Sequence, residues 1–326
     1  MSACTSSIAC SCVAADAKPP IAVLTGPTGT GKSGYAMRLA REFPIEIVSV
    51  DSAQVYRGLD IGSAKPDAAE RAAVPHHLID LVEPTASYSA GQFARDAAQA
   101  IDDIEARGRV PLLVGGTMLY LRSLIGGIAT LPKGSESVRA AIDADAGRLG
   151  WAAMHARLGE VDAAAAARIH PNDTQRIQRA LEVFFASGRP ISELQTATTR
   201  PIDREFICAA LLPHDRARLH IALSQRFEAM MKSGLLDEVR GLFARGDLTD
   251  THPAVRAVGY RQLWSHLAGA YPLETAVARA IAATRQLAKR QMTWLRSMPD
   301  IDVFDPYETH SFVGLRESLI ASFERA

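Results

Sequence analysis

The sequence predicts an α/β fold in which helices cover both faces of a parallel sheet and an all-helical domain is inserted into it. Two observations lead to this class. First, short apolar runs alternate with helical patterns between residues 21 and 125, an order typical of a parallel sheet. Second, residues 135–190 contain alanine-rich helical stretches and no convincing strand, yet another buried strand follows at 206–212. An insertion explains this order better than two consecutive domains.

The expected elements follow one another in a regular order. Residues 21–25 form a short apolar strand stopped by Gly26 and Pro27, and the helix at 34–43 ends at Pro44. The later elements are strands at 45–50, 77–82 and 110–114, an amphipathic helix at 89–107, and helices between the strand at 206–212 and about residue 298.

These elements give a domain organisation with a core interrupted once. We expect a P-loop catalytic core at 20–124 and 200–326, with a helical insertion domain at 125–199. Residues 1–19 are expected to be a disordered leader without a functional role. Its cysteines have a spacing that matches no zinc site, so reduced thiols are expected there.

Composition restricts the class of protein further. The chain has 326 residues, of which 48% are hydrophobic and 22% charged, values ordinary for a globular enzyme. No stretch approaches the roughly 20 apolar residues that span a bilayer. The first basic residue is Lys18, so the positive start of a secretory signal is missing. We expect a cytoplasmic protein with no membrane partner.

The most specific motif lies at the end of the first strand. A strand, a glycine-rich loop ending in Gly-Lys-Ser and a helix form the usual context of a phosphate-binding loop. Backbone N–H groups and the helix N-terminus would surround an anion, Lys32 would reach the terminal phosphate oxygens, and Ser33 would ligate Mg²⁺. The loop consists of Gly26, Pro27, Thr28, Gly29, Thr30, Gly31, Lys32 and Ser33.

A carboxylate follows the second strand, where P-loop proteins often place one. Asp51 could act as a metal ligand, as a general base, or as a cap of the turn into Ser52. The fourth strand ends in Gly115-Gly116-Thr117 without a second carboxylate, and no guanine-recognition motif is present. These absences disfavour a motor or a GTPase switch and favour a transferase.

The formal net charge is zero, but basic residues gather near the C-terminus. On a helix, Arg285, Lys289 and Arg296 would share one face, and no acidic residue interrupts the region 275–299. This stripe is a candidate contact for a nucleic-acid backbone. A solvated helix face is the alternative.

Several ordered blocks resemble the tRNA dimethylallyltransferase (tRNA isopentenyl-transferase) family. They cover all but the leader and the tail, and the chain lacks the C-terminal zinc finger of eukaryotic relatives, so it resembles the bacterial form. The blocks are the loop 26–33, 50–66 (VDSAQVYRGLDIGSAKP), 76–80 (HHLID), 88–93 (YSAGQF), 115–120 (GGTMLY), 175–179 (QRIQR), 256–261 (RAVGYR) and 289–296 (KRQMTWLR).

The resemblance implies a reaction. A dimethylallyl group would pass from dimethylallyl diphosphate to the N6 amine of the adenosine 3′ of the anticodon, in tRNAs that read codons beginning with U. Asp51 matches the family's catalytic aspartate, Arg226 an arginine that contacts the diphosphate, and Thr28 a loop threonine with a substrate role. Lys32 and Mg²⁺ would stabilise the departing diphosphate. By family habit the enzyme would be a monomer.

The resemblance also implies contacts with the anticodon stem-loop of tRNA. They come from the segment after the second strand, from the insertion and from the C-terminal helices. The residues are Asp51, Ser52, Ala53, Gln54, Thr117, Arg139, Gln175, Arg176, Ile177, Gln178, Arg179, Arg256, Ala257, Val258, Gly259, Tyr260, Arg261, Lys289, Arg290, Gln291, Met292, Thr293, Trp294, Leu295 and Arg296.

Two other functions share parts of this pattern. A small-molecule kinase would use the same loop with ATP and Mg²⁺, but it needs no tRNA-facing blocks. An RNA-binding module would use the loop to hold a phosphate backbone, but it needs no general base. Asp51 together with residues 256–261 therefore favours the transferase over both.

Overall fold

The computed structural model describes residues 18–129, 131–132, 134–196 and 198–323. They fall into two compact units whose boundaries lie at Tyr88, Ala98, Met118 and Ile202. The expected leader lies outside the described residues except for its last two positions. Within the described part, no helix is long and apolar enough to cross a membrane.

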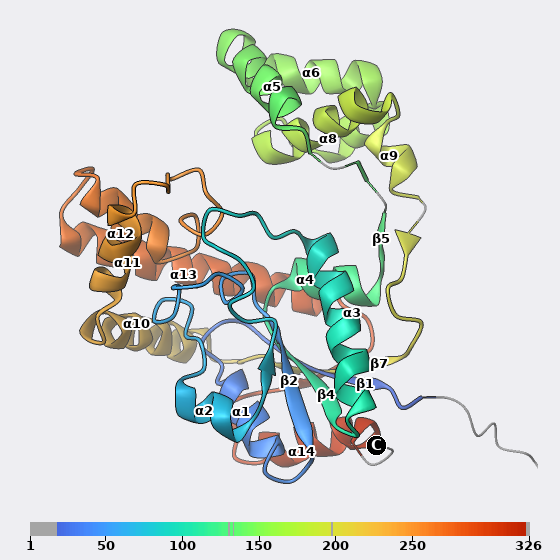
Figure 1. The fold of residues 1–326 in the computed structure, drawn as a ribbon, viewed down its shortest axis with the longest axis vertical. Helices are drawn as coiled ribbons and strands as arrows, with labels where there is room; N and C mark the ends of the chain where they lie inside the picture. Colours follow the sequence, from blue (N-terminus) through green and yellow to red (C-terminus); the bar gives the residue numbers. More distant parts are fainter. Residues whose placement is uncertain (1–17, 130, 133, 197, 324–326) are drawn as a thin grey trace, which may run out of the picture. The chain divides into compact units, whose positions relative to one another are not determined.

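The first unit is built on a six-stranded sheet in which every described pairing is parallel (Figure 1). This confirms the parallel sheet predicted from the sequence. From edge to edge the strands are β3 (His76–His77), β2 (Ile45–Val50), β4 (Val110–Gly115), β1 (Ile21–Thr25), β7 (Phe206–Leu211) and β8 (Ile301–Phe304). Because parallel strands end at a common edge, the segments that follow β1, β2 and β4 meet there.

Helices α1 (Lys32–Leu39) and α14 (Ser311–Leu319) share a buried cluster with the sheet. Ala22 and Leu24 of β1 contribute to this cluster together with Leu39 of α1 and Phe312 of α14. Successive side chains of a strand point to opposite faces, so these alternate positions mark the face that the two helices cover. Every residue of β1, β2 and β4 is buried, as expected for a parallel sheet covered on both sides.

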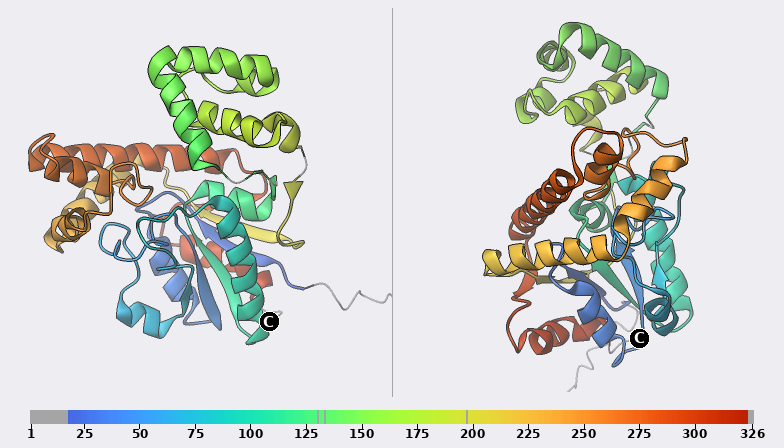
Figure 2. Two further views of the ribbon diagram at one scale, coloured as in Figure 1. Left: turned by 45° about the horizontal axis from the view of Figure 1, so that its top comes forward. Right: turned by 90° about the vertical axis from the view of Figure 1, so that its left-hand side faces the viewer.

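A second buried cluster of the first unit joins four of its other helices, whose ribbons Figure 2 shows from two further sides. Phe227, Val239, Leu263 and Ala280 contribute to it, along with Val55 from the segment after β2. The sequence segment that carries Asp51 is thereby attached to the C-terminal half of the chain. The helices of this part are α10 (Arg216–Lys232), α11 (Leu235–Ala244), α12 (Tyr260–Leu267) and α13 (Leu273–Arg296), whereas α2 (Ala68–Ala73) has no buried residue and does not contribute to the cluster.

The second unit is mainly helical and has its own core, in which Ile142, Met154, Leu158, Ile177 and Leu181 are buried. It begins earlier in the chain than the predicted insertion, because it also takes residues 89–98 and 119–124. Its elements are the first part of α3 (Ala90–Ala106), α4 (Met118–Ile125), α5 (Glu136–Leu149), α6 (Trp151–Val161), α7 (Ala163–Arg168), α8 (Thr174–Ser187), α9 (Ile191–Leu194) and the antiparallel pair β5 (Ile128–Ala129) and β6 (Thr198–Thr199).

One predicted strand is wrong. The apolar run 77–82 forms only the two-residue strand β3, because Leu78 and Asp80 have φ angles of 62° and 56°, which no strand accommodates. Hydrogen bonds from Lys65 (2.5 Å) and Arg71 (2.9 Å) hold the Asp80 carboxylate in the resulting turn. Burial raises the pKa of this carboxyl, but the two cationic donors outweigh it and the pKa is lowered.

The edge strand β8 was missed by the sequence analysis, which expected only helices up to about residue 298 and nothing regular beyond. It pairs with β7 through Cys208↔Ile301 and Leu211↔Phe304. Its middle residues, Asp302 and Val303, are exposed. The long-range pairing with β7, rather than a strong local pattern, therefore stabilises this strand.

Candidate active site

The segment 26–33 connects β1 to α1 at the carboxyl edge of the sheet, as predicted. Gly26, Gly29 and Gly31 have φ angles of 149°, 84° and 80°, which side-chain-bearing residues rarely adopt. A Cβ atom on Gly26 would lie 2.6 Å from the Leu211 carbonyl oxygen, so the close approach to β7 requires glycine. Among the described residues no side chain caps α1, so its first N–H groups are available to an anion.

Hydrogen bonds within the loop fix its shape. The Thr30 hydroxyl donates to the Pro27 carbonyl oxygen at 2.9 Å, and Lys32 Nζ donates to the same oxygen at 2.8 Å. Directly before the loop, the hydroxyl of Thr25, the last residue of β1, donates to the Gly115 carbonyl oxygen at 2.9 Å and ties β1 to the end of β4. The ammonium group therefore lies inside the curl of the loop, where a bound phosphate would meet it.

Two charged residues join the loop from distant parts of the sequence. Arg226 of α10 donates from Nη1 to the Thr28 hydroxyl at 3.2 Å, across a separation of 198 residues. Asp51 follows β2 directly, and its Oδ1 accepts hydrogen bonds from the backbone N–H groups of Ala53 (2.8 Å) and Gln54 (3.4 Å). Asp51 therefore caps its own turn. Its Oδ2 makes no hydrogen bond to the described residues.

The charges of Lys32, Asp51 and Arg226 act on one another. Burial and, to a smaller extent, the nearby Arg226 lower the pKa of Lys32 to about 7, although Asp51 acts in the opposite direction. Burial also raises the pKa of Asp51, against the backbone hydrogen bonds and the two cations, which lower it. A lysine that titrates near neutrality and a carboxylate of increased basicity beside a phosphate loop are typical of a catalytic centre.

A glutamine from α13 completes the contacts of the loop. Gln291 Oε1 accepts a hydrogen bond from the Thr28 backbone N–H at 2.9 Å, while its Nε2 donates to the Gly116 carbonyl oxygen at 2.8 Å. Beside it, the Thr117 hydroxyl accepts from the Ser52 N–H at 3.0 Å. The predicted residues Thr28, Ser52, Thr117 and Gln291 thus lie in one connected site.

The predicted tRNA contacts after β2 divide into exposed and internal groups. Ser52 is exposed, whereas Gln54 is tied down by three hydrogen bonds. Its Oε1 accepts from the Ser49 hydroxyl at 2.7 Å, and its Nε2 donates to the carbonyl oxygens of Ser63 (3.3 Å) and Ala64 (3.2 Å). This geometry gives Gln54 a role in holding the Asp51 turn.

In the block 256–261, Arg256 and Arg261 are exposed while Tyr260 is buried. The Tyr260 hydroxyl donates to Glu238 at 2.6 Å. Glu238 also accepts hydrogen bonds from the backbone N–H groups of residues 60, 61 and 62 at 3.0, 2.7 and 3.2 Å. The sequence analysis missed Glu238, because an acidic residue in the first turn of a helix is ordinary by sequence.

The block 289–296 forms the last two turns of α13. Lys289, Arg290, Thr293, Trp294 and Arg296 are exposed, and Met292 and Leu295 are buried. Arg285, the first member of the predicted basic stripe, is instead half-buried and donates to the Ser224 hydroxyl at 2.8 Å. The exposed cations therefore concentrate at the C-terminal end of the helix.

The second unit carries the remaining predicted RNA contacts. In α8, Gln175 and Arg176 are exposed and Ile177 is buried in the core. The nearly inaccessible carboxylate of Glu182 binds Arg139 (3.2 Å) and Arg179 (2.8 Å). Gln178 donates to Asp143 at 2.5 Å. Glu182, which the sequence analysis did not identify, holds two of the predicted contact residues on one surface.

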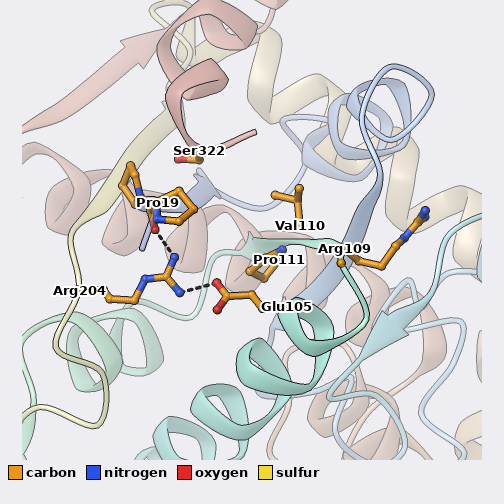
Figure 3. A pocket seen from close by; sticks show the side chains of 9 residues that line it. Pro19, Glu105, Arg109, Val110, Pro111, Arg204 and Ser322 are labelled. Carbon is orange, nitrogen blue, oxygen red and sulfur yellow. Dashed lines mark hydrogen bonds and ion pairs between the residues drawn. The ribbon is translucent and has the colours of Figure 1, made fainter. Parts of the chain in front are cut away.

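A cavity of about 180 Å³ lies at the opposite, amino-terminal edge of the sheet (Figure 3). Arg204 spans it by donating to the Pro19 carbonyl oxygen and to the Glu105 carboxylate. None of its lining residues belongs to the predicted site. The chemistry therefore concentrates at the carboxyl edge, around the loop.

Comparisons with known proteins agree with this geometry. A family profile described as IPP transferase matches residues 54–298, and one described as isopentenyl transferase matches residues 19–83. The chain belongs to the IPP transferase family. Similar curated relatives of this chain include the tRNA dimethylallyltransferases of Bordetella petrii (55% identity over 289 residues, 88% of this chain and 92% of the relative) and Paraburkholderia phymatum (55% over 293 residues, 89% and 92%).

Similar solved structures cover nearly the whole length of this chain. The tRNA isopentenylpyrophosphate transferase of Bacillus halodurans aligns with a TM-score of 0.69 and 33% identity, over 94% of this chain and 97% of that one. A eukaryotic dimethylallyltransferase acting on tRNA aligns with a TM-score of 0.77 and 26% identity, over 93% and 79%. The family resemblance inferred from the sequence blocks is confirmed.

Proposed function

We propose that this protein transfers the dimethylallyl group of dimethylallyl diphosphate to the N6 amine of the adenosine 3′ of the anticodon, in tRNAs that read codons beginning with U. The products are N6-(dimethylallyl)adenosine and diphosphate. The observation that carries the proposal is Asp51, a carboxylate of raised pKa, placed with Lys32 and Arg226 around a phosphate loop. The names of the relatives supply the group transferred and the acceptor.

The chemistry needs a base on one side and an anion site on the other. The lone pair of the adenine amine is delocalised into the ring, so the amine is a poor nucleophile until its proton leaves. Asp51 accepts that proton as the new C–N bond forms, while the C–O bond to the diphosphate breaks. Lys32, Arg226 and the loop N–H groups stabilise the charge that develops on the leaving diphosphate.

The residues present also suit a magnesium ion. Ser33 is exposed at the start of α1, and its hydroxyl makes no hydrogen bond to the described residues. Hard oxygen ligands of this kind, completed by substrate phosphate, are the usual setting of Mg²⁺. When bound, the ion would neutralise diphosphate charge, with Ser33 as its protein ligand.

For the RNA, we propose that the exposed members of the predicted blocks make the contacts. In the first unit these include Ser52, Arg256, Arg261 and Lys289, and in the second unit the exposed side chains of α8. An unpaired anticodon loop suits the reaction, because an adenine outside a duplex can leave its stack at low cost. We further propose that the enzyme acts in the cytoplasm as a monomer, which sedimentation would check.

One experiment separates the candidate functions. The protein is incubated with anticodon stem-loop RNA, labelled dimethylallyl diphosphate, ATP and Mg²⁺, and a matched RNA carries guanosine at the target position. Label on the first RNA alone supports the proposal. ATP consumption without label would indicate the kinase instead, and RNA binding without either reaction would indicate the binding module.

A further inference from the structure

Gln291 makes hydrogen bonds to both sides of the diphosphate site, although it lies 263 residues from the loop in sequence. Its carbonyl oxygen accepts from the Thr28 N–H, and its amide nitrogen donates to the Gly116 carbonyl oxygen. A side-chain amide has a carbonyl oxygen that accepts and an NH₂ group that donates, so only one orientation of Gln291 satisfies both partners. The side chain thus links the loop after β1 to the end of β4.

Gly116 is shaped to this contact. A Cβ atom at position 116 would lie 2.6 Å from Gln291 Nε2 and 2.9 Å from the Gly26 carbonyl oxygen. Any larger residue would therefore push the amide away from the loop or disturb the loop itself. The second glycine of the Gly115-Gly116-Thr117 segment is explained by the need to admit Gln291.

Thr28 is held from two helices at once. Its backbone N–H is bound by Gln291 of α13, and its hydroxyl is bound by Arg226 of α10 at 3.2 Å. Both contacts fix one peptide of the phosphate loop. A loop fixed in this way loses less conformational entropy when an anion binds.

The neighbours of Gln291 on α13 have a different environment. Lys289 and Arg290 are exposed, Met292 is buried in the core, and Gln291 lies between these two environments. Its carbonyl oxygen and one amide N–H are already engaged inside the protein. This placement distinguishes Gln291 from the exposed cations beside it.

We propose that Gln291 is a positioning residue for the diphosphate loop and not an RNA contact. Its amide holds the Thr28 peptide against the end of β4, so that the cradle is formed before the diphosphate arrives. This inference rests on the proposed function only for the identity of the anion. The ligand chemistry that the loop recognises is a diphosphate group.

The test compares two variants of the same helix, Gln291→Met and Lys289→Ala. Inorganic diphosphate with Mg²⁺ and anticodon stem-loop RNA are each titrated separately by calorimetry, and steady-state kinetics are measured with dimethylallyl diphosphate. Methionine keeps the length of glutamine and loses both hydrogen bonds, at a net value of about 1 kcal/mol each, so we expect about five- to thirtyfold weaker diphosphate binding. KM for dimethylallyl diphosphate should rise similarly, with RNA affinity within about twofold.

Lys289→Ala should show the reverse pattern, with weaker RNA binding and unchanged diphosphate binding. Gly116→Ala should also weaken diphosphate binding, because its Cβ would displace the same amide and would lie close to the Gly26 carbonyl oxygen of the loop; Gln291→Met, which leaves Gly116 in place, isolates the contribution of the amide. If Gln291→Met instead weakened RNA binding alone, or lowered only the melting temperature, the positioning role would be refuted. Diphosphate titration requires no transfer reaction, so failure of wild-type prenylation would reject the proposed function without deciding this test.

Discussion

The lowered pKa of Lys32 leads to a quantitative prediction about pH. With a pKa of about 7 in the ligand-free protein, Lys32 is about 90% charged at pH 6 and about 10% charged at pH 8. A bound diphosphate favours the charged form, so the complex retains the proton. If only the protonated form binds, affinity for inorganic diphosphate falls about tenfold from pH 6 to pH 8.

The assay is calorimetry across this range in two buffers of different ionisation enthalpy, which also counts protons taken up on binding. Lys32→Met is the control, because it reports the titration of the ligand and of all other groups. We expect uptake of close to one additional proton at pH 8 in the wild type. Equal pH dependence in the wild type and in Lys32→Met would refute the argument.

The lowered pKa of Lys32 also makes the free energy of unfolding depend on pH. The folded pKa of Lys32 lies below the usual lysine value of 10.5, so between about pH 7 and 10.5 the folded state holds fewer protons than the unfolded state. The contribution of Lys32 to the free energy of unfolding of the ligand-free protein therefore increases as pH rises through this window. Chemical denaturation at several pH values, compared with Lys32→Met, measures it.

Three substitutions test other parts of the site. Asp51→Asn keeps an acceptor for the turn but removes the base. Single-turnover transfer should therefore fall about 10²–10⁴-fold, while RNA affinity stays within about tenfold of the wild type. Near-normal transfer would show that Asp51 is not the base. Glu238→Ala removes the acceptor of four hydrogen bonds, so the free energy of unfolding measured with urea should fall by about 2–4 kcal/mol. The control Asp237→Ala, at an exposed position, should change it little. Glu182→Ala leaves Arg139 and Arg179 without their buried partner and should lower stability by about 3 kcal/mol; unchanged unfolding would contradict the assigned ion pairs.

Local sequence patterns predicted most of the central sheet. The strands at 21–25 and 45–50 were placed at their observed bounds, because buried parallel strands are short, continuous apolar runs. The run 77–82 is also mainly apolar but turns after His77, since Lys65 and Arg71 draw the Asp80 carboxylate into a turn. Nothing in the local pattern of 77–82 reveals those two cations.

In the candidate site, too, local sequence patterns predicted some features and not others. The phosphate loop and Asp51 could be read from the sequence, because a strand, a turn and a helix N-terminus place such groups within a few residues of one another. Their partners from distant parts of the chain could not be identified from such local patterns. The family resemblance supplied Arg226 and Gln291, but only the structure shows Gln291 engaged with the loop.

The sequence by itself therefore determined the parallel sheet, the glycine-rich loop at its edge, the position of Asp51 and the family. Each of these depends on residues close together in the chain, where periodicity and backbone conformation act directly. The tertiary structure alone decided which residues of a motif face solvent, as Lys289 does, and which are engaged internally, as Gln291 is. It also revealed Glu238 and Glu182, because a hydrogen-bond partner is chosen by proximity in space, which helix packing sets and sequence spacing does not.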